Sequence, residues 1–314
     1  MDLGSWEDFT FVSHPASSES DYSYLGVVPS GKHVPIKIKQ GVAAGLNTPG
    51  LSCDMQTLIG TTYPSKPDSN SGVTGVLSGF VCDWALSSFS TVAEVHSALS
   101  STHSVHGPDA LAFHFIFRDA LGESLVVEFL PDPATGDPRT NLHLDLDDGE
   151  SGFGITTNEP PFPWHVTNVL HYEWKRSLSR PAVAVPGGFY PDERFLRLHS
   201  LKNGLEDPAS YEEHVQNAVH LLNAVTIPKG DMLATDSGAG EGEGDHTIFG
   251  LVYDHDRDDP KIYFRSYDNQ SMRRLRLADL KNLDDVGGDD AFMPVAGGAE
   301  LYYIDAAADF RSKV

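Results

Sequence analysis

Short runs of β-branched and aromatic residues come in pairs along this chain, and they limit the folds that it can adopt. Leu111 to Arg118 and Ser124 to Leu130 are two such runs, joined by a turn at Asp119 to Gly122. Short runs of this kind are typical of strands, and a tight turn between two of them predicts a β-hairpin. Thr247 to Tyr253 and Lys261 to Tyr267 predict a second hairpin across a charged loop. The chain should therefore contain antiparallel sheet.

Helical signals gather in segments of their own. Thr91 to Glu94 has the spacing of a capping box and opens an apolar pattern of helical period that runs to Leu99. Asp207-Pro208 predicts a cap and a first-turn proline for the apolar stripe between Tyr211 and Leu222. A third helix is expected over Val76 to Ser88. Strands and helices in separate clusters, without regular alternation, favour an α+β layered domain.

The 314 residues are enough for one large or two small domains, and 40% hydrophobic and 21% charged residues are typical of a globular protein. The chain carries 22 Lys+Arg against 45 Asp+Glu, a formal net charge of -23. Nucleic acid and anionic membrane surfaces would be repelled by this charge, so neither is an expected partner. No window reaches the ~18 consecutive apolar residues of a membrane span. The N-terminus lacks the basic and apolar regions of a secretory signal, and the compartment stays open.

Cysteine usage is sparse. Cys53 and Cys82 are the two cysteines of the chain, too few for a disulfide framework or a zinc cluster. One bridge between them stays open, although two buried structural thiols are the more usual arrangement for isolated cysteines in apolar segments.

No motif for a metal or a cofactor stands out. The 14 histidines include no His-Glu-x-x-His set or similar ligand spacing. Asp254 to Asp259 is acidic enough to hold a hard cation, but it lacks the glycine and the distal glutamate of a calcium loop, so a solvated hairpin tip is the favoured interpretation. The glycine-rich stretch Ser237 to Asp245 follows no strand, opens no helix and carries carboxylates that would repel phosphate. We therefore expect no cofactor and no metal.

Four separated segments form a specific combination. Gly45 to Cys53 is a glycine- and asparagine-containing turn that feeds a strand, and Thr157 to Asn168 joins an asparagine to aromatic residues. Pro186 to Arg197 contains prolines, glycines and arginines, and Asp245 to Asn269 covers the second predicted hairpin. In this order and spacing the segments resemble the choloylglycine hydrolase family, which includes bile-salt hydrolases and penicillin V acylases.

The resemblance implies a fold and a chemistry. Family members fold as N-terminal-nucleophile (Ntn) hydrolases, a four-layer αββα sandwich with two antiparallel sheets, so the resemblance implies a single domain over residues 1–314. Their nucleophile is a cysteine exposed at the N-terminus by processing, and its own α-amine, with a pKa near ~7.7–8.0, takes up the thiol proton. The thiolate attacks a linear amide, and fixed donors stabilise the oxyanion. The implied activity is hydrolysis of linear amide C–N bonds of the bile-salt hydrolase or penicillin V acylase type.

The resemblance also assigns roles to individual residues. Asp2 matches the aspartate that holds the nucleophile and its amine in position. Asn158 matches the asparagine whose side-chain amide donates to the oxyanion, and the backbone amide near Thr57 matches the second donor. Arg194 matches the arginine that stabilises charge close to the thiolate.

One part of the family pattern is absent. The first strand, which should precede Met1 and carry the nucleophilic cysteine, is missing from the sequence, and neither Cys53 nor Cys82 is an obvious substitute. Two explanations stay open. Either the sequence begins at an internal methionine and the cysteine lies upstream, or the chain is a catalytically inactive relative that binds acyl ligands or a partner protein. Retention of the other site residues favours the first explanation.

The expected partner is a small-molecule acyl amide. The segment from Asn158 to Arg194 is shorter than in bacterial family members, which build a tetramer with an extended hairpin there. A monomer or a homodimer is therefore expected in place of that tetramer.

Overall fold

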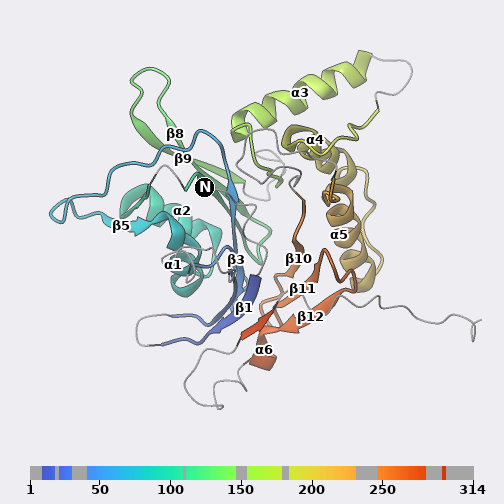
Figure 1. Ribbon diagram of the computed structural model, residues 1–314, viewed down its shortest axis with the longest axis horizontal. Helices are drawn as coiled ribbons and strands as arrows, with labels where there is room; N and C mark the ends of the chain where they lie inside the picture. Colours follow the sequence, from blue (N-terminus) through green and yellow to red (C-terminus); the bar gives the residue numbers. More distant parts are fainter. Residues whose placement is uncertain are drawn as a thin grey trace, which may run out of the picture.

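Two antiparallel sheets lie against each other between layers of helices in the computed structural model of the chain (Figure 1). The structure describes residues 9–17, 21–29, 41–108, 111–145, 154–178, 184–230, 246–280 and 292–294. Asp2 and the glycine-rich stretch 237–245 lie outside these residues. The architecture is the α+β, αββα sandwich that the sequence predicts.

The larger sheet has eight antiparallel strands among the described residues. From β1 to β9 their order follows the chain with one insertion between β4 and β7, and β13, from late in the chain, pairs with β1 at the edge. The predicted hairpin of residues 111–130 is confirmed, because Phe115 pairs with Val127 and Arg118 with Ser124. The strands, in spatial order, are β13 (Phe292–Pro294), β1 (Phe9–His14), β2 (Tyr24–Pro29), β3 (Ala44–Asn47), β4 (Ser52–Thr57), β7 (Phe113–Arg118), β8 (Ser124–Pro131) and β9 (Pro138–Asp145).

The smaller sheet contains β10 (Phe249–Asp254), β11 (Lys261–Ser266) and β12 (Arg273–Arg276). The second predicted hairpin is confirmed by the pairing of β10 with β11. Ile262 and Phe264 of the small sheet pack on Phe11, Leu25 and other apolar residues of the large sheet. This contact forms the inner core of the sandwich.

Helices α1 (Val81–Ser88) and α2 (Val92–Ser101) cover the outer face of the large sheet, in a core that includes Phe113, Phe115 and Phe117 (Figure 1). The predicted capping box is present, because Glu94 N–H donates to Thr91 and the Glu94 carboxylate accepts from the Thr91 N–H. Helix α2 therefore begins where its sequence predicts.

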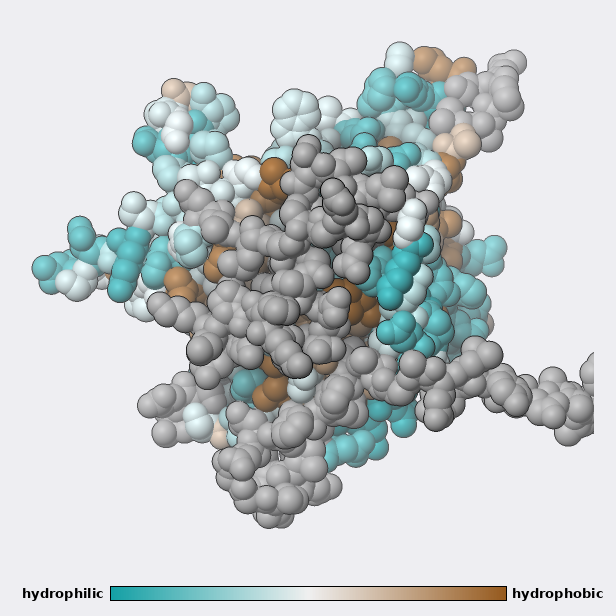
Figure 2. All heavy atoms as spheres, viewed as in Figure 1, coloured by the Kyte–Doolittle hydropathy of each residue, from teal (hydrophilic) through white to brown (hydrophobic). Residues whose placement is uncertain are grey.

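The other helices lie on the opposite side of the large sheet (Figure 1). Among them, α5 packs against the outer face of the small sheet. Figure 2 shows mostly hydrophilic residues over the outer side of α5 and a hydrophobic group at the far end of α3. Trp164, Trp174 and Leu178 of α3 are exposed. The helices are α3 (Phe162–Leu178), α4 (Pro191–Lys202), α5 (Tyr211–Val225) and the short α6 (Leu277–Leu280).

Two local predictions are wrong. The helix expected from Val76 begins at Val81, because residues 74–77 form strand β5, which pairs in parallel with β6 (His103–His106) and is followed by the 3-10 turn η2 (Ser78–Phe80). The cap of α5 is Ser210 and not Asp207, since the Ser210 hydroxyl accepts the N–H of Glu213. The first boundary is set by the distant strand β6, whereas the second is set by a local cap three residues from its partner.

Cys53 of β4 and Cys82 of α1 form a disulfide across a sequence separation of 29 residues. The interpretation of two free buried thiols is therefore wrong, and the single bridge is the correct alternative. Both cysteines are fully buried in the outer core. Since these are the two cysteines of the sequence, the chain holds no free thiol.

Reduction of this disulfide should destabilise the fold. A cross-link that closes a loop of 29 residues contributes roughly 3–4 kcal/mol to the free energy of unfolding, chiefly by restricting the unfolded chain. Denaturant unfolding with and without a reductant measures this difference. The double variant Cys53→Ser/Cys82→Ser is the control, since reductant should leave it unchanged. An equal midpoint for oxidised and reduced wild-type protein would contradict the prediction.

Candidate active site

Three of the four residues assigned from the sequence meet at one end of the large sheet. Asn158 Nδ2 donates to the carbonyl oxygen of Thr57 at 2.9 Å, and an Arg194 nitrogen donates to Asn158 Oδ1 at 2.8 Å. Thr57 ends β4, Asn158 precedes α3, and Arg194 lies in the first turn of α4. Asp2 lies outside the described residues.

The two hydrogen bonds fix the direction of the Asn158 amide. A guanidinium only donates and a carbonyl only accepts, so the amide oxygen must face Arg194 and the nitrogen must face Thr57. An amide nitrogen carries two hydrogens, and the Thr57 carbonyl takes one of them. At Thr57 itself, the carbonyl is the group that contacts Asn158, whereas the sequence assigned a role to a backbone N–H.

Arg194 is held from both sides. Its Nε donates to the carbonyl of Phe189 at 2.9 Å, while its terminal nitrogen reaches Asn158. Arg197, about one turn further along α4, donates to the carbonyls of Pro186 and Ala224. These bonds tie the segment before α4 to both arginines, so the guanidinium of Arg194 is presented on a fixed backbone.

A buried histidine supports the backbone beside Asn158. His165 is fully buried, and its ring stacks on Phe195 with centroids 4.3 Å apart. Its Nε2 lies 3.3 Å from the Asn158 carbonyl oxygen and 3.3 Å from Thr157 Oγ1, which itself donates to the carbonyl of Pro191. Because the carbonyl only accepts, Nε2 carries the proton. Burial lowers the pKa of His165, which favours its neutral form.

Glu128 anchors the start of α3. It is fully buried on β8, and its Oε1 accepts the N–H of Phe162 at 2.8 Å. Its Oε2 lies 3.2 Å from His143 Nε2, and His114 Nδ1 is 3.7 Å from Oε1. Burial opposes ionisation, but the hydrogen bonds from His143 and Phe162 and the nearby His114 ring hold the pKa of Glu128 at about 2. A buried carboxylate therefore holds the first residue of α3, directly after the segment that carries Asn158.

Asp54 and Tyr253 meet between the two sheets. Tyr253 Oη on β10 donates to Asp54 Oδ1 on β4 at 2.8 Å. Burial raises the pKa of Asp54 to about 7, against the hydrogen bond from Tyr253, which lowers it. The sequence analysis missed Asp54 and Glu128, because an isolated carboxylate in a strand carries no signal of its distant partners.

The acidic hairpin tip 254–259 is an ion-pair cluster. Lys261 Nζ lies 3.1 Å from Asp254 and 3.1 Å from Asp259, and Arg276 also pairs with Asp259 at 2.9 Å.

Across the described ranges, no group of three or more His, Cys, Asp or Glu side chains is arranged to hold a metal ion. None of the helices in those ranges has the length and apolarity needed to cross a membrane.

A layered sandwich of two antiparallel sheets between helices defines the class as an Ntn hydrolase fold. The chain belongs to the linear amide C-N hydrolases of the choloylglycine hydrolase family, whose model matches residues 13–289.

Individual relatives agree with this family. The chain is 27% identical over 215 residues to a bile salt hydrolase/transferase of Clostridium perfringens, a match that covers 60% of each chain. A crystal structure of conjugated bile acid hydrolase from Clostridium perfringens superposes with a TM-score of 0.68 at 20% identity, over 95% of this chain and 91% of that one. Penicillin V acylase from Agrobacterium tumefaciens gives a TM-score of 0.68 at 18% identity, over 93% and 84%. The chain spans 60–65% of the length of the curated relatives it matches.

Ionisation of Asp54 should make stability depend on pH. The folded protein keeps Asp54 protonated up to about pH 7, whereas its ordinary pKa is 3.8. Between these values the folded state holds one more proton than the unfolded state, so this group's stabilisation is complete at low pH and is lost as pH rises to about 7. Asp54→Asn, which can still accept from Tyr253, should remove this loss and stabilise the protein by roughly 2–4 kcal/mol at about pH 8, but little at about pH 4.

Urea unfolding of both proteins across this pH range measures the effect. Asp137→Asn is the matched control, because Asp137 is an exposed carboxylate in the turn between β8 and β9. A parallel pH profile for wild type and Asp54→Asn would show that Asp54 ionises normally in the folded protein.

Proposed function

We propose that this chain is the larger part of an amidohydrolase, an enzyme that cleaves a linear C–N amide bond in a small acyl amide. The observation that carries the proposal is the Asn158 amide, oriented by the Thr57 carbonyl and the Arg194 guanidinium. Membership of the choloylglycine hydrolase family supports the same chemistry. Conjugated bile acids and penicillin V are the substrates to test, because the relatives' names include them.

The proposed reaction has two steps. A thiolate adds to the amide carbonyl carbon, and the carbonyl oxygen becomes an oxyanion. When the intermediate collapses, the C–N bond breaks and the departing nitrogen takes the proton that the α-amine accepted from the thiol, which releases the amine and leaves an acyl thioester. Water then hydrolyses the thioester and returns the acid. The remaining N–H of Asn158 Nδ2 donates to the oxyanion in both steps, and Arg194 keeps the amide from rotating away. Asp2 takes the position beside the nucleophile and its amine.

The nucleophile is proposed to lie on sequence upstream of Met1. Cys53 and Cys82 are joined in a disulfide, so neither supplies a thiolate. Sequencing the transcript ahead of Met1 tests this part, and a strand-like segment that begins with a cysteine after processing is expected. A transcript without a cysteine codon in that region would remove the proposed nucleophile.

Activity of the N-terminally extended protein should depend on Asn158. Loss of one oxyanion donor costs about 3 kcal/mol of barrier, so Asn158→Ala should lower kcat about 100- to 1,000-fold with a small change in KM. Release of the amine from taurine-conjugated bile acid and from penicillin V is the measurement. Asn223→Ala is the matched control, because Asn223 is exposed on α5. Equal kcat for Asn158→Ala and wild type would rule out the assigned role.

A second function is favoured by the absence of a free thiol in the given sequence. In that case the chain is a catalytically inactive relative that binds acyl ligands or a partner protein. It would bind bile acids or penicillin V without releasing amine, in the extended form as well as in this one. Turnover by the extended protein separates the two functions.

A further inference from the structure

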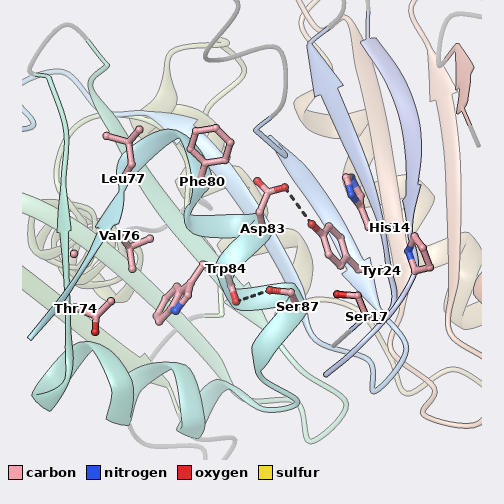
Figure 3. A pocket seen from close by; sticks show the side chains of 12 residues that line it. His14, Ser17, Tyr24, Thr74, Val76, Leu77, Phe80, Asp83, Trp84 and Ser87 are labelled. Atoms are coloured by element: carbon pink, nitrogen blue, oxygen red, sulfur yellow. Dashed lines mark hydrogen bonds between the residues drawn. The ribbon is translucent and has the colours of Figure 1, made fainter. Parts of the chain in front are cut away.

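An open pocket of about 630 Å³ lies on the outer face of the large sheet, away from Asn158 (Figure 3). One side is formed by β5, η2 and α1, and the other by the ends of β1 and β2. Tyr24 packs in the outer core with α1, whereas α3 packs with Val126 on the opposite side of the sheet. The volume falls within the ~300–1,000 Å³ of small-molecule sites.

The pocket walls are aromatic and apolar. Figure 3 shows Trp84 and Val76 on one side and Tyr24 with His14 on the other. The His14 ring stacks on Tyr24, with centroids 4.4 Å apart and an angle of 12° between the planes. Phe80 completes the aromatic lining. Faces of such rings attract cations, because their π-electrons are the negative end of the ring quadrupole.

Asp83 provides a negative charge in this aromatic wall. Its Oδ2 accepts the N–H of Val42 at 2.8 Å, and its Oδ1 accepts from Tyr24 Oη at 3.2 Å. Both donors are neutral, and within the described ranges Asp83 makes no ion pair. Burial raises the pKa of Asp83 to about 6, against these hydrogen bonds. Among the described residues, this carboxylate therefore has no counter-charge at neutral pH, which is unfavourable unless a cation joins it.

We propose that this pocket binds a protonated primary amine with an apolar arm. The ammonium group donates to a free lone pair of the Asp83 carboxylate and lies against the rings of Tyr24 and Trp84, while the arm covers Val76 and Leu77. A primary ammonium fits because the Asp83 carboxylate accepts the hydrogen bonds that the N–H groups of the ammonium donate. The described lining residues include neither Lys nor Arg, and the chain has a formal net charge of -23, so an anion is disfavoured. This binding does not depend on amide cleavage.

Calorimetric titration of the 314-residue chain with phenethylamine at neutral pH tests the proposal. Saturable binding is expected at millimolar or lower concentrations. 2-Phenylethanol, which has the same arm without the charge, should bind at least about tenfold more weakly. Equal binding of amine and alcohol, or no saturable binding of the amine, would overturn the proposal.

Two variants locate the site. Asp83→Asn should weaken phenethylamine binding at least about tenfold, whereas Asp137→Asn, which loses the same charge on an exposed turn, should not. Leu77→Lys serves where Asp83→Asn fails to fold, because Leu77 is 38% exposed at the pocket rim and tolerates a polar side chain. Leu77→Lys should weaken binding more than Leu77→Gln, because both lose the same apolar contact but only the lysine adds a charge that repels the amine. Wild-type affinity in Leu77→Lys would contradict the assignment to this pocket.

Discussion

The side-chain amide of Asn158 joins three parts of the chain that are distant in sequence. Thr57 precedes it by 101 residues and Arg194 follows it by 36, yet both bond directly to the same carboxamide. Because one partner only donates and the other only accepts, the amide cannot rotate by half a turn without losing both bonds. The direction of its remaining N–H is therefore set by the placement of β4 and α4, and a preorganised donor of this kind is what an oxyanion requires.

Strands β7 and β8 direct their buried phenylalanines and their buried polar side chains to opposite faces of the large sheet. Successive side chains of a strand point to opposite faces, so Phe113, Phe115 and Phe117 enter the outer core while His114 faces the other side. On β8 the same alternation places Glu128 beside α3. The buried carboxylate tolerates its position because the Phe162 N–H and His143 both form hydrogen bonds with it. His114 and Glu128 therefore lie on the side of the sheet where α3 and Asn158 lie.

Sequence patterns predicted the elements whose signals are local. The hairpin of β7 and β8 and the capping box at Thr91 depend on neighbouring residues, and both are confirmed. The helix expected from Val76 failed because β5 pairs with β6, which is contributed by residues beyond α2. Asp54 was missed for the same reason, since its partner Tyr253 lies 199 residues away. Asn158 and Arg194 were found through a family pattern, and not through any local property of their segments.

The position of the cysteines bears on the source of a nucleophile. Cys53 and Asp54 are adjacent on β4, so their side chains point to opposite faces of the sheet. Cys53 enters the outer core with α1, and Asp54 meets Tyr253 between the sheets. Reduction of the disulfide would release a thiol on the outer face, whereas Glu128 and α3 lie on the other. Redox change alone therefore does not bring a thiol to the Asn158 amide, and amide cleavage at that site needs a cysteine from another segment, which is where the proposed function places it.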